Sequence, residues 1–186
     1  MLQAIDAFAI ILGKIRQLLK SMNHVKEQHD ISQWIGLIIS IMVCFGVAGL
    51  GSLSTNPSIE GWYAALQKPS WNPPIWVFGP VWSALYLMMA IAAWLVWRER
   101  GLSGASLPLT LFAIQLLLNG LLSILFFGLH RPGLAFAEIL VLWGAILATL
   151  VSFWRVTTLA GVLLLPYFFW VTFAAFLNFT IWRMNS

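Results

Sequence analysis

Polar side chains are rare in the long apolar runs of this chain, and three of them share one helical face. Gln115, Asn119 and Ser123 follow each other at intervals of four residues, which places them on one side of a helix. Their simplest role is hydrogen bonding between helices, and the alternative is that the carboxamides line a cavity. Glu138, the only acid within an apolar run, is either solvated near an interface or protonated and paired inside. We expect it to fix helix packing, because a proton relay needs further titratable groups.

Two aromatic stripes could bind a flat molecule. Trp82 and Tyr86 are spaced i, i+4, and Trp170, Ala174 and Asn178 are spaced i, i+4, i+8. A large aromatic side chain beside a small one shapes a slot for a ring system. Such stripes taken alone more often pack a core. Together with an aromatic connector and a glycine-rich first apolar run, they favour a hydrophobic ligand pocket.

Several classes of chemistry lack the residues they need. His24, His29 and His130 lie outside the apolar runs, and no Ser/His/Asp set, paired carboxylates or metal-ligand cluster accompanies them. Cys44 is the single cysteine and stands in an apolar run, as a small core residue does. Neither a GxxxxGK phosphate loop nor a compact Lys/Arg patch occurs. The sequence therefore predicts no metal, no cofactor and no nucleic-acid partner.

Composition places the chain in a membrane. It is 61% hydrophobic and 9% charged, whereas soluble domains have about 25% charged residues. Five apolar runs are each close to the roughly 20 residues that a spanning helix requires. They cover about 34–53, 76–97, 107–129, 134–154 and 160–182. We predict an all-α integral membrane protein, a bundle of five transmembrane helices in which sequential helices are antiparallel neighbours.

The one long connector, between the first two runs, is unusually aromatic. Prolines at 69, 73, 74 and 80 are expected to prevent a regular helix before position 80. Aromatic side chains lie in or beside this segment, namely Trp62, Tyr63, Trp71, Trp76 and Trp82. We expect the connector to fold over the mouth of the bundle as a lid.

Residues 1–30 are treated as an extension to the transmembrane domain of residues 31–186. The extension is read as an interfacial amphipathic helix followed by a polar linker, or in part as a disordered tail. With five spans, seven Lys and Arg residues fall on the side of the N-terminus and three on the other side. This bias favours an N-terminus inside the cell and a lid outside. The membrane is expected to be a bacterial cell membrane, or the mitochondrial outer membrane in a eukaryote.

Several motifs together resemble one family. WYAALQKPSWNPP, FGPVWSALY, QLLLN followed by FFGLH, LLLPYFFW and FLNFTIW occur in order between about Trp34 and Asn185. In these motifs the chain is similar to the translocator protein / tryptophan-rich sensory protein family, formerly the peripheral benzodiazepine receptor family. The resemblance implies a five-helix bundle, a homodimer, and a cavity under the first loop. It implies that the cavity binds porphyrins, sterols in animal members, and drug-like ligands.

The resemblance also implies which side chains bind the ligand. The positions that match the pocket tryptophans are Trp82 and Trp170, which would be the catalytic residues if porphyrin were degraded. Other matching positions are Phe78, Gly79, Val81, Asn119, Val141, Ala174 and Leu177. The stripes and the lid add Trp71, Tyr86 and Asn178 to the predicted ligand-binding residues.

Three positions depart from the family pattern. Leu122 and Leu134 stand where relatives often have Trp, so the pocket is expected to be less aromatic on that side. Phe179 stands where animal members have the Tyr of a cholesterol motif. Cholesterol binding is therefore weakly supported.

The predicted function is that of a membrane receptor or sensor for tetrapyrroles of the protoporphyrin type, with other hydrophobic ligands as alternatives, in tetrapyrrole handling or stress response. Two alternatives stay open. One is an enzyme that degrades porphyrin with light and oxygen, and the other is a transporter of tetrapyrroles or sterols. The expected partners are a porphyrin or another hydrophobic small molecule, membrane lipid and a second copy of the chain.

Overall fold

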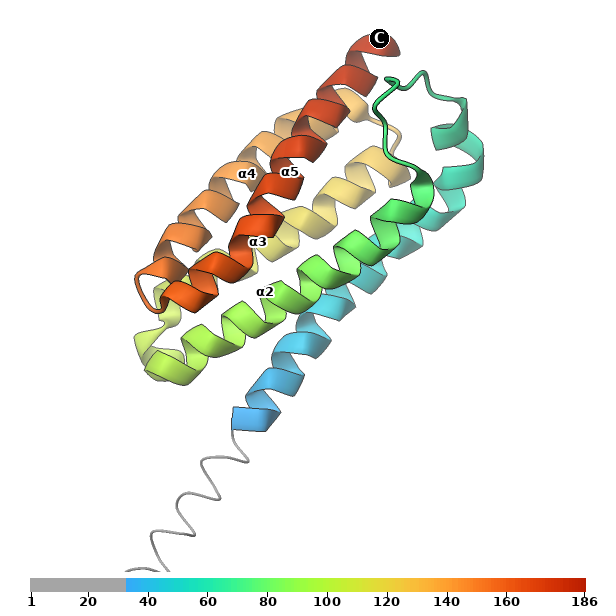
Figure 1. Ribbon diagram of the computed structural model, residues 1–186. Coiled ribbons are helices and arrows are strands. Elements are labelled where there is room, and N and C mark those ends of the chain that lie inside the picture. The colour runs from blue at the N-terminus through green and yellow to red at the C-terminus, as the bar shows by residue number, and fades with distance from the viewer. Residues whose placement is uncertain (1–32) are drawn as a thin grey trace, which may run out of the picture. The chain divides into compact units, whose positions relative to one another are not determined.

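The computed structural model describes residues 33–186, and in this part of the chain it contains helices and no strands. Five helices are long and apolar enough to cross a membrane (Figure 1). They are the first helix (Gln33–Tyr63), α2 (Ile75–Gly104), α3 (Ser106–Ser123) extended by the π-helical turn η2 (Ile124–Gly128), α4 (Pro132–Trp154) and α5 (Thr158–Met184). The prediction of an all-α bundle with five membrane spans is confirmed. The expected surface helix and linker of residues 1–30 lie outside the described residues.

The first two helices are longer than predicted and the connector is correspondingly shorter. The first helix continues past Leu53 and ends in a π-helical turn, η1 (Ile59–Tyr63). Helix α2 begins at Ile75 and contains Pro80. The expectation that no regular helix would form before position 80 was therefore wrong. Pro80 is the sixth residue of α2, so its nitrogen cannot donate to the Trp76 carbonyl, and the helix forms there with one intrahelical hydrogen bond fewer.

The turn between α2 and α3 is tighter than the interval between the predicted runs 76–97 and 107–129 indicates. Gly101 has φ 65° and ψ 176°, which interrupts the regular helix shortly after the predicted end of the second apolar run at about residue 97. Glycine adopts positive φ at little cost. One further turn then leads through Ala105 directly into α3.

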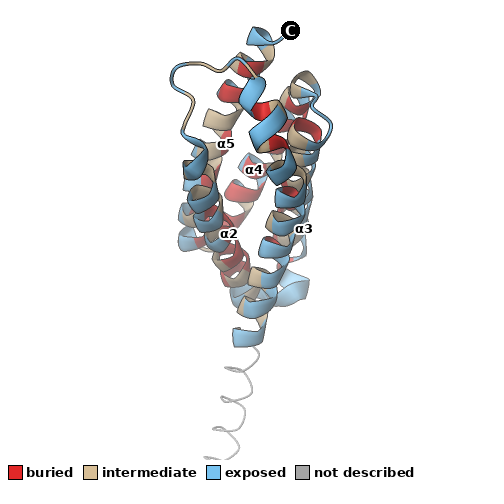
Figure 2. Ribbon diagram, turned by 90° about the vertical axis from the view of Figure 1, so that its right-hand side faces the viewer, coloured by how far each residue is buried: buried red, intermediate tan, exposed pale blue. Residues whose placement is uncertain are grey.

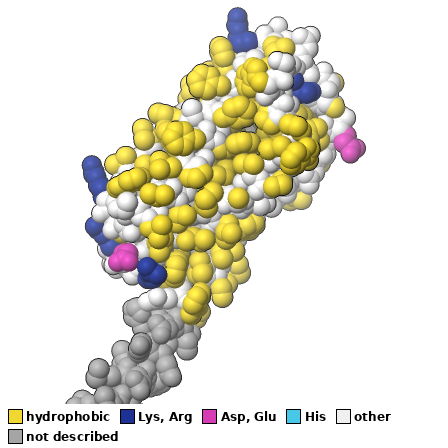
Figure 3. All heavy atoms as spheres, in the orientation of Figure 1, with side chains coloured by type: hydrophobic (Ala, Val, Ile, Leu, Met, Phe, Trp, Pro, Cys, Tyr) yellow, Lys and Arg dark blue, Asp and Glu magenta, His cyan; other side chains and the backbone are white. Residues whose placement is uncertain are grey.

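Within the unit Leu37–Ser186, the buried residues lie mostly on helix segments turned toward the middle of the bundle, and the exposed residues lie mostly on the outside (Figure 2). Helix α4 packs most extensively against α5 and α3, and α2 packs against α5. Met89, Leu142 and Val171 are fully buried, whereas Leu117 and Phe176 are 70% and 68% exposed. Apolar side chains also cover the face seen in Figure 3, with Lys and Arg toward the ends of the helices. This surface is the one that lipid requires of an integral membrane protein.

The connections alternate between the two ends of the bundle. At one end, the Arg100 guanidinium donates from Nη2 to the Arg155 carbonyl at 3.4 Å, which joins the α2–α3 turn to the α4–α5 turn. At the other end, Asn185 near the C-terminus bonds to Gln67 in the connector before α2. Ser70 and Ser103 are both exposed and lie at opposite ends of α2.

We predict that Ser70→Cys and Ser103→Cys react with an impermeant thiol reagent from opposite sides of the membrane. A single span separates the two positions. The native thiol of Cys44 is fully buried, so the parent chain gives a low background. The measurement is labelling of right-side-out and inverted vesicles. Labelling of both cysteines from the same side would contradict the five-span arrangement.

Candidate functional site

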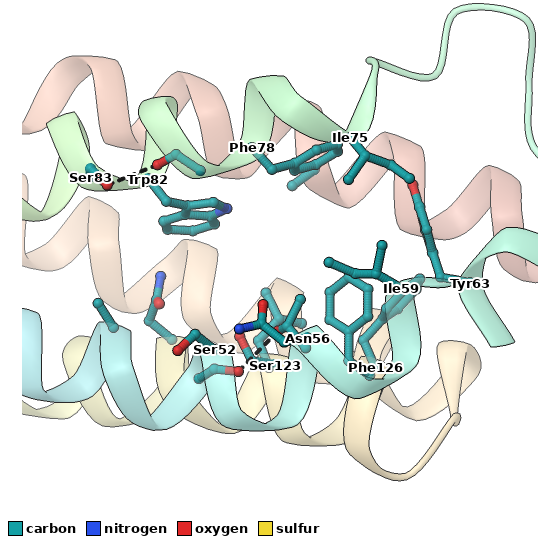
Figure 4. Close-up of a pocket in the computed structure, with 18 of the residues that line it drawn as sticks. Ser52, Asn56, Ile59, Tyr63, Ile75, Phe78, Trp82, Ser83, Ser123 and Phe126 are labelled. Atoms are coloured by element: carbon teal, nitrogen blue, oxygen red, sulfur yellow. Dashed lines mark hydrogen bonds between the residues drawn. The ribbon is translucent and has the colours of Figure 1, made fainter. Parts of the chain in front are cut away.

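A cavity of about 650 Å³ lies between the first helix, α2, α3 and α5, at the end of the bundle that carries the connector. Its α2 wall is a stripe of residues at helical spacing (Figure 4), consisting of Ile75, Trp76, Phe78, Gly79, Trp82, Ser83 and Tyr86. The opposite wall comes from the first helix and from α3 with η2, including Ser52, Thr55, Asn56, Ile59, Ser123 and Phe126. Ala174, Leu177, Asn178 and Ile181 of α5 and Ile139 of α4 complete the lining. The cavity has the size and mostly apolar character of a small-molecule site.

Four buried side chains below the cavity form a hydrogen-bond network that joins three helices. The Tyr86 hydroxyl donates to Asn119 Oδ1 at 2.5 Å, and Asn119 Nδ2 donates to the Tyr167 hydroxyl at 2.9 Å. The Tyr167 hydroxyl in turn donates to Gln115 Oε1 at 2.9 Å. This chain of bonds links α2, α3 and α5. Gln115 and Asn119, on the predicted polar face of α3, therefore form hydrogen bonds to side chains of neighbouring helices. Asn119 also lines the cavity.

The aromatic wall rests on this network. The Trp82 ring lies 6.2 Å from the Tyr167 ring and 5.7 Å from the Tyr86 ring, centroid to centroid. Tyr167 is completely buried. The indole of Trp82 is thus supported from below by two tyrosines whose hydroxyls are fixed by hydrogen bonds.

The lid loop, which we define as residues 66–74, is tied down at several points. The Lys68 ammonium donates to the carbonyls of Tyr63, Ala64 and Leu66 at 2.6, 3.1 and 2.9 Å, and so caps the end of the first helix. The Tyr63 hydroxyl donates to Asn72 Oδ1 at 2.9 Å. The Asn185 carboxamide both accepts from the Gln67 N–H and donates to the Gln67 carbonyl, each at 2.9 Å. The lid loop is therefore anchored to the first helix and to the end of α5.

A second set of contacts holds the first helix against the α3–α4 turn. The Ser58 hydroxyl donates to the Phe127 carbonyl at 2.7 Å and lies 3.2 Å from His130 Nε2. The Trp62 ring stacks on the His130 ring at 4.4 Å with an interplanar angle of 15°. Trp62 is therefore part of a helix contact and not of a free connector.

Glu138 is buried, and neither of its carboxyl oxygens has a hydrogen-bond partner among the described residues. The alternative in which it is solvated near an interface is therefore wrong, and the hydrogen-bonded pair of the other alternative is not seen. Glu138 does not line the cavity, although the next residue, Ile139, does.

Comparison with known proteins agrees with this architecture. A model of the TspO/MBR family matches residues 40–183. This chain belongs to the TspO/MBR family. The human translocator protein is 46% identical over 126 residues, which is 67% of this chain and 75% of the human protein. The tryptophan-rich protein TspO of Chlorobaculum tepidum is 41% identical over 82% of this chain and 98% of its own length. The tryptophan-rich sensory protein of Cereibacter sphaeroides is 39% identical over 82% of this chain and 92% of its own length.

Most of the ligand-binding residues predicted from the TspO/MBR resemblance and from the aromatic stripes lie together in the cavity. The lining includes Phe78, Gly79, Trp82, Tyr86, Asn119, Ala174, Leu177 and Asn178. In the carboxamide orientation that satisfies both of its polar atoms, Asn178 donates to the Pro132 carbonyl at 2.9 Å and accepts from the Phe136 N–H at 3.3 Å, at the start of α4. The structure thus brings these positions around one space, and their role in binding stays a prediction.

Four of the predicted positions lie outside the lining. Val141 is 60% exposed on the outer surface of α4. Val81 is half-buried and packs against the core. Trp71 packs edge-on against Phe173, with ring centroids 5.8 Å apart.

Trp170 is the fourth of these positions and is separated from the cavity by one side chain. Its ring lies 5.9 Å from that of Phe78, which does line the cavity. The Nε1 of Trp170 is buried and has no hydrogen-bond partner among the described residues.

The departures from the TspO/MBR pattern fall in different environments. Leu122 lines the cavity, so a smaller aliphatic side chain replaces an aromatic one there. Leu134 is 55% exposed and does not line it. Phe179 packs against Phe136 with ring centroids 5.1 Å apart.

The residues by which the first helix lines the cavity were not predicted from the sequence. Ser52 and Asn56 are spaced i, i+4 and could have been recognised as one polar face. The prediction ended the first helix at Leu53, and the spacing was therefore not read across that boundary. Tyr167 was also missed, because a single tyrosine in LLLPYFFW gives no sign of its partners in α2 and α3.

We predict that Tyr167→Phe lowers the free energy of unfolding by about 1–3 kcal/mol, because Asn119 and Gln115 then each lose a buried partner. Tyr63→Phe is a matched control at the lid loop, because it removes only one hydrogen bond, to the half-buried Asn72, whereas Tyr167→Phe removes two. It should cost less than half as much. The measurement is thermal or denaturant unfolding in detergent. Equal stability of Tyr167→Phe and the parent would contradict the network's structural role.

Proposed function

We propose that this protein is a membrane receptor that binds a tetrapyrrole of the protoporphyrin type in the cavity beneath the lid loop. The observation that carries the proposal is the cavity itself, about 650 Å³ with an aromatic stripe on α2 and no charged side chain among its described lining residues. A flat conjugated ring gains most from such a wall, since aromatic contacts add about 0.5–1.5 kcal/mol to the burial of apolar surface.

The biological role that we propose is sensing or handling of tetrapyrroles, including under stress. The relatives named translocator protein and tryptophan-rich sensory protein support a receptor or sensor of this kind. The chain carries its Lys and Arg mostly on the side of the N-terminus, which supports a cytoplasmic N-terminus. The bacterial relatives, aligned over nearly their whole length, support a bacterial cell membrane. A homodimer remains part of the proposal.

Light-dependent degradation of the bound porphyrin is a second candidate that one observation favours. The indole of Trp82 projects into the cavity (Figure 4), and an indole is more easily oxidised than a phenyl ring. Trp170 lies one side chain further away, in contact with Phe78. Transport can be distinguished experimentally from binding and from degradation, because only a transporter moves porphyrin into sealed liposomes.

We predict that purified protein binds protoporphyrin in the dark and that Trp82→Phe weakens this binding by only a few fold, since a single stacking contact is worth about 0.5–1.5 kcal/mol. If Trp82 is the oxidised group, Trp82→Phe slows light-dependent loss of the Soret band far more than it lowers affinity. Trp170→Phe is the matched control and should photobleach closer to the parent. The measurement is an optical titration in the dark followed by illumination.

Each outcome of this titration decides between functions. Failure of the parent protein to bind protoporphyrin would refute the receptor proposal. Equal photobleaching by the parent, Trp82→Phe and Trp170→Phe would leave these tryptophans as walls of a binding pocket and would remove the enzyme alternative.

A further inference from the structure

Two arginines from different helices meet at the end of the bundle opposite the lid loop. Arg100 lies near the end of α2, and Arg155 follows the last residue of α4. The Arg100 guanidinium donates to the Arg155 carbonyl at 3.4 Å, so the two residues are in contact although 55 positions separate them in the sequence. Figure 3 shows Lys and Arg side chains at this end, next to the apolar surface of the helices. The fold thus holds two residues with positively charged side chains together.

Neither of these charges is neutralised within the described part of the chain. The ion pair found there joins Arg98 to Glu99 at 3.5 Å, and Arg98 also lies over the Trp94 ring, 4.8 Å from its centroid. Glu99 is the only acidic residue at this end among the described residues. The bond to the Arg155 carbonyl uses one of the several N–H groups of Arg100. The pair therefore keeps most of its donors for an anion, and a planar guanidinium is well shaped to bind a phosphate.

A tryptophan lies directly beside the pair, at the last residue of α4. The Trp154 ring packs on α5, because a Cβ built on Gly161 would clash with it. The residue is nevertheless 43% exposed. Tryptophans at the ends of membrane spans lie at the level of the lipid headgroups. Arg155, the next residue, is therefore at headgroup depth, and so is Arg100, which contacts it.

An apolar surface continues from this tryptophan toward the middle of the membrane. Leu147 and Val151 precede Trp154 at seven and three residues, which places all three on one face of α4, and all three are exposed. Leu159 and Val162 of α5 are exposed as well. A molecule that satisfies both the arginines and this surface has an anionic headgroup and hydrocarbon chains. Free phosphate would contact the arginines alone.

We propose that Arg100, Arg155 and Trp154 form a binding site for one anionic phospholipid, whose phosphodiester joins the α2–α3 turn to the α4–α5 turn. Basic pockets between transmembrane helices on the cytoplasmic side bind anionic headgroups, and the Lys and Arg bias of the chain favours the cytoplasm for this end. The site lies away from the cavity, which is at the end that carries the lid loop. The inference therefore goes beyond the proposed function and does not depend on the ligand of the cavity.

The test titrates the full chain, purified in detergent, with phosphatidylglycerol and counts bound lipid by native mass spectrometry. The parent should bind one phosphatidylglycerol per chain in preference to phosphatidylcholine, and this lipid should raise its melting temperature. Arg155→Gln removes one charge and keeps the carbonyl that accepts from Arg100. It should lower phosphatidylglycerol affinity about fivefold, as expected for one arginine at a membrane surface. Arg131→Gln, the matched control, removes the same charge from an exposed position at the opposite end, and should leave the affinity within about twofold of the parent.

The outcomes distinguish a specific site from general attraction to positive charge. Equal losses of affinity in Arg155→Gln and Arg131→Gln would overturn the site, and so would phosphatidylglycerol that accumulates without saturating. An equal rise in melting temperature with inorganic phosphate would overturn the assignment to a lipid. If Arg155→Gln does not fold, Arg100→Gln decides by the same comparison with Arg131→Gln. No arm of this experiment contains porphyrin, so failure of the lipid site leaves the proposed function standing, and the reverse also holds.

Discussion

The constraint on which the structure depends is that a polar group within a membrane bundle must find its partner inside the protein. Tyr167 meets this constraint for three helices, because its hydroxyl accepts from Asn119 and donates to Gln115, and Asn119 also accepts from Tyr86. The network fixes the relative rotation of α2, α3 and α5. It also sets the floor of the cavity, since Tyr86 and Asn119 line it.

The cavity can remain open because the elements around it are held from both ends. Below, Tyr167 and Tyr86 support the ring of Trp82. At the aqueous end, Lys68 caps the first helix and Asn185 ties the lid loop to α5. Neither Lys68 nor Asn185 lines the cavity. An apolar wall, a few polar groups and a restrained loop are the parts that a receptor for a hydrophobic ligand needs, and membership of the TspO/MBR family places this bundle among membrane sensors and receptors.

How much could be predicted from the sequence depended on how local the signal was. The spans were predictable because each is a long apolar run. The shared face of Gln115 and Asn119 was predictable because a four-residue spacing places two side chains on one side of a helix. The rotation of a helix against its neighbours is not local. Adjacent residues differ by about 100° around the axis, so Trp82 lines the cavity whereas Val81 packs in the core. Asn56 was missed because the first helix continues beyond the end of its apolar run. Contacts with residues distant in sequence, such as the bond from Ser58 to the Phe127 carbonyl, lie in this extension, and the local sequence does not reveal them.

The most direct test of the account is whether filling the cavity abolishes porphyrin binding. Gly79 lines it, and a Cβ added there meets nothing within 4 Å, so Gly79→Leu should fold and occupy the ligand's space. Gly144 in α4 has equally open space and lies outside the lining, which makes Gly144→Leu the matched control. We predict that Gly79→Leu lowers protoporphyrin affinity at least about tenfold, by denying the ring its aromatic wall, and that Gly144→Leu leaves it within about twofold of the parent. Equal affinities of the two variants would contradict binding in this cavity.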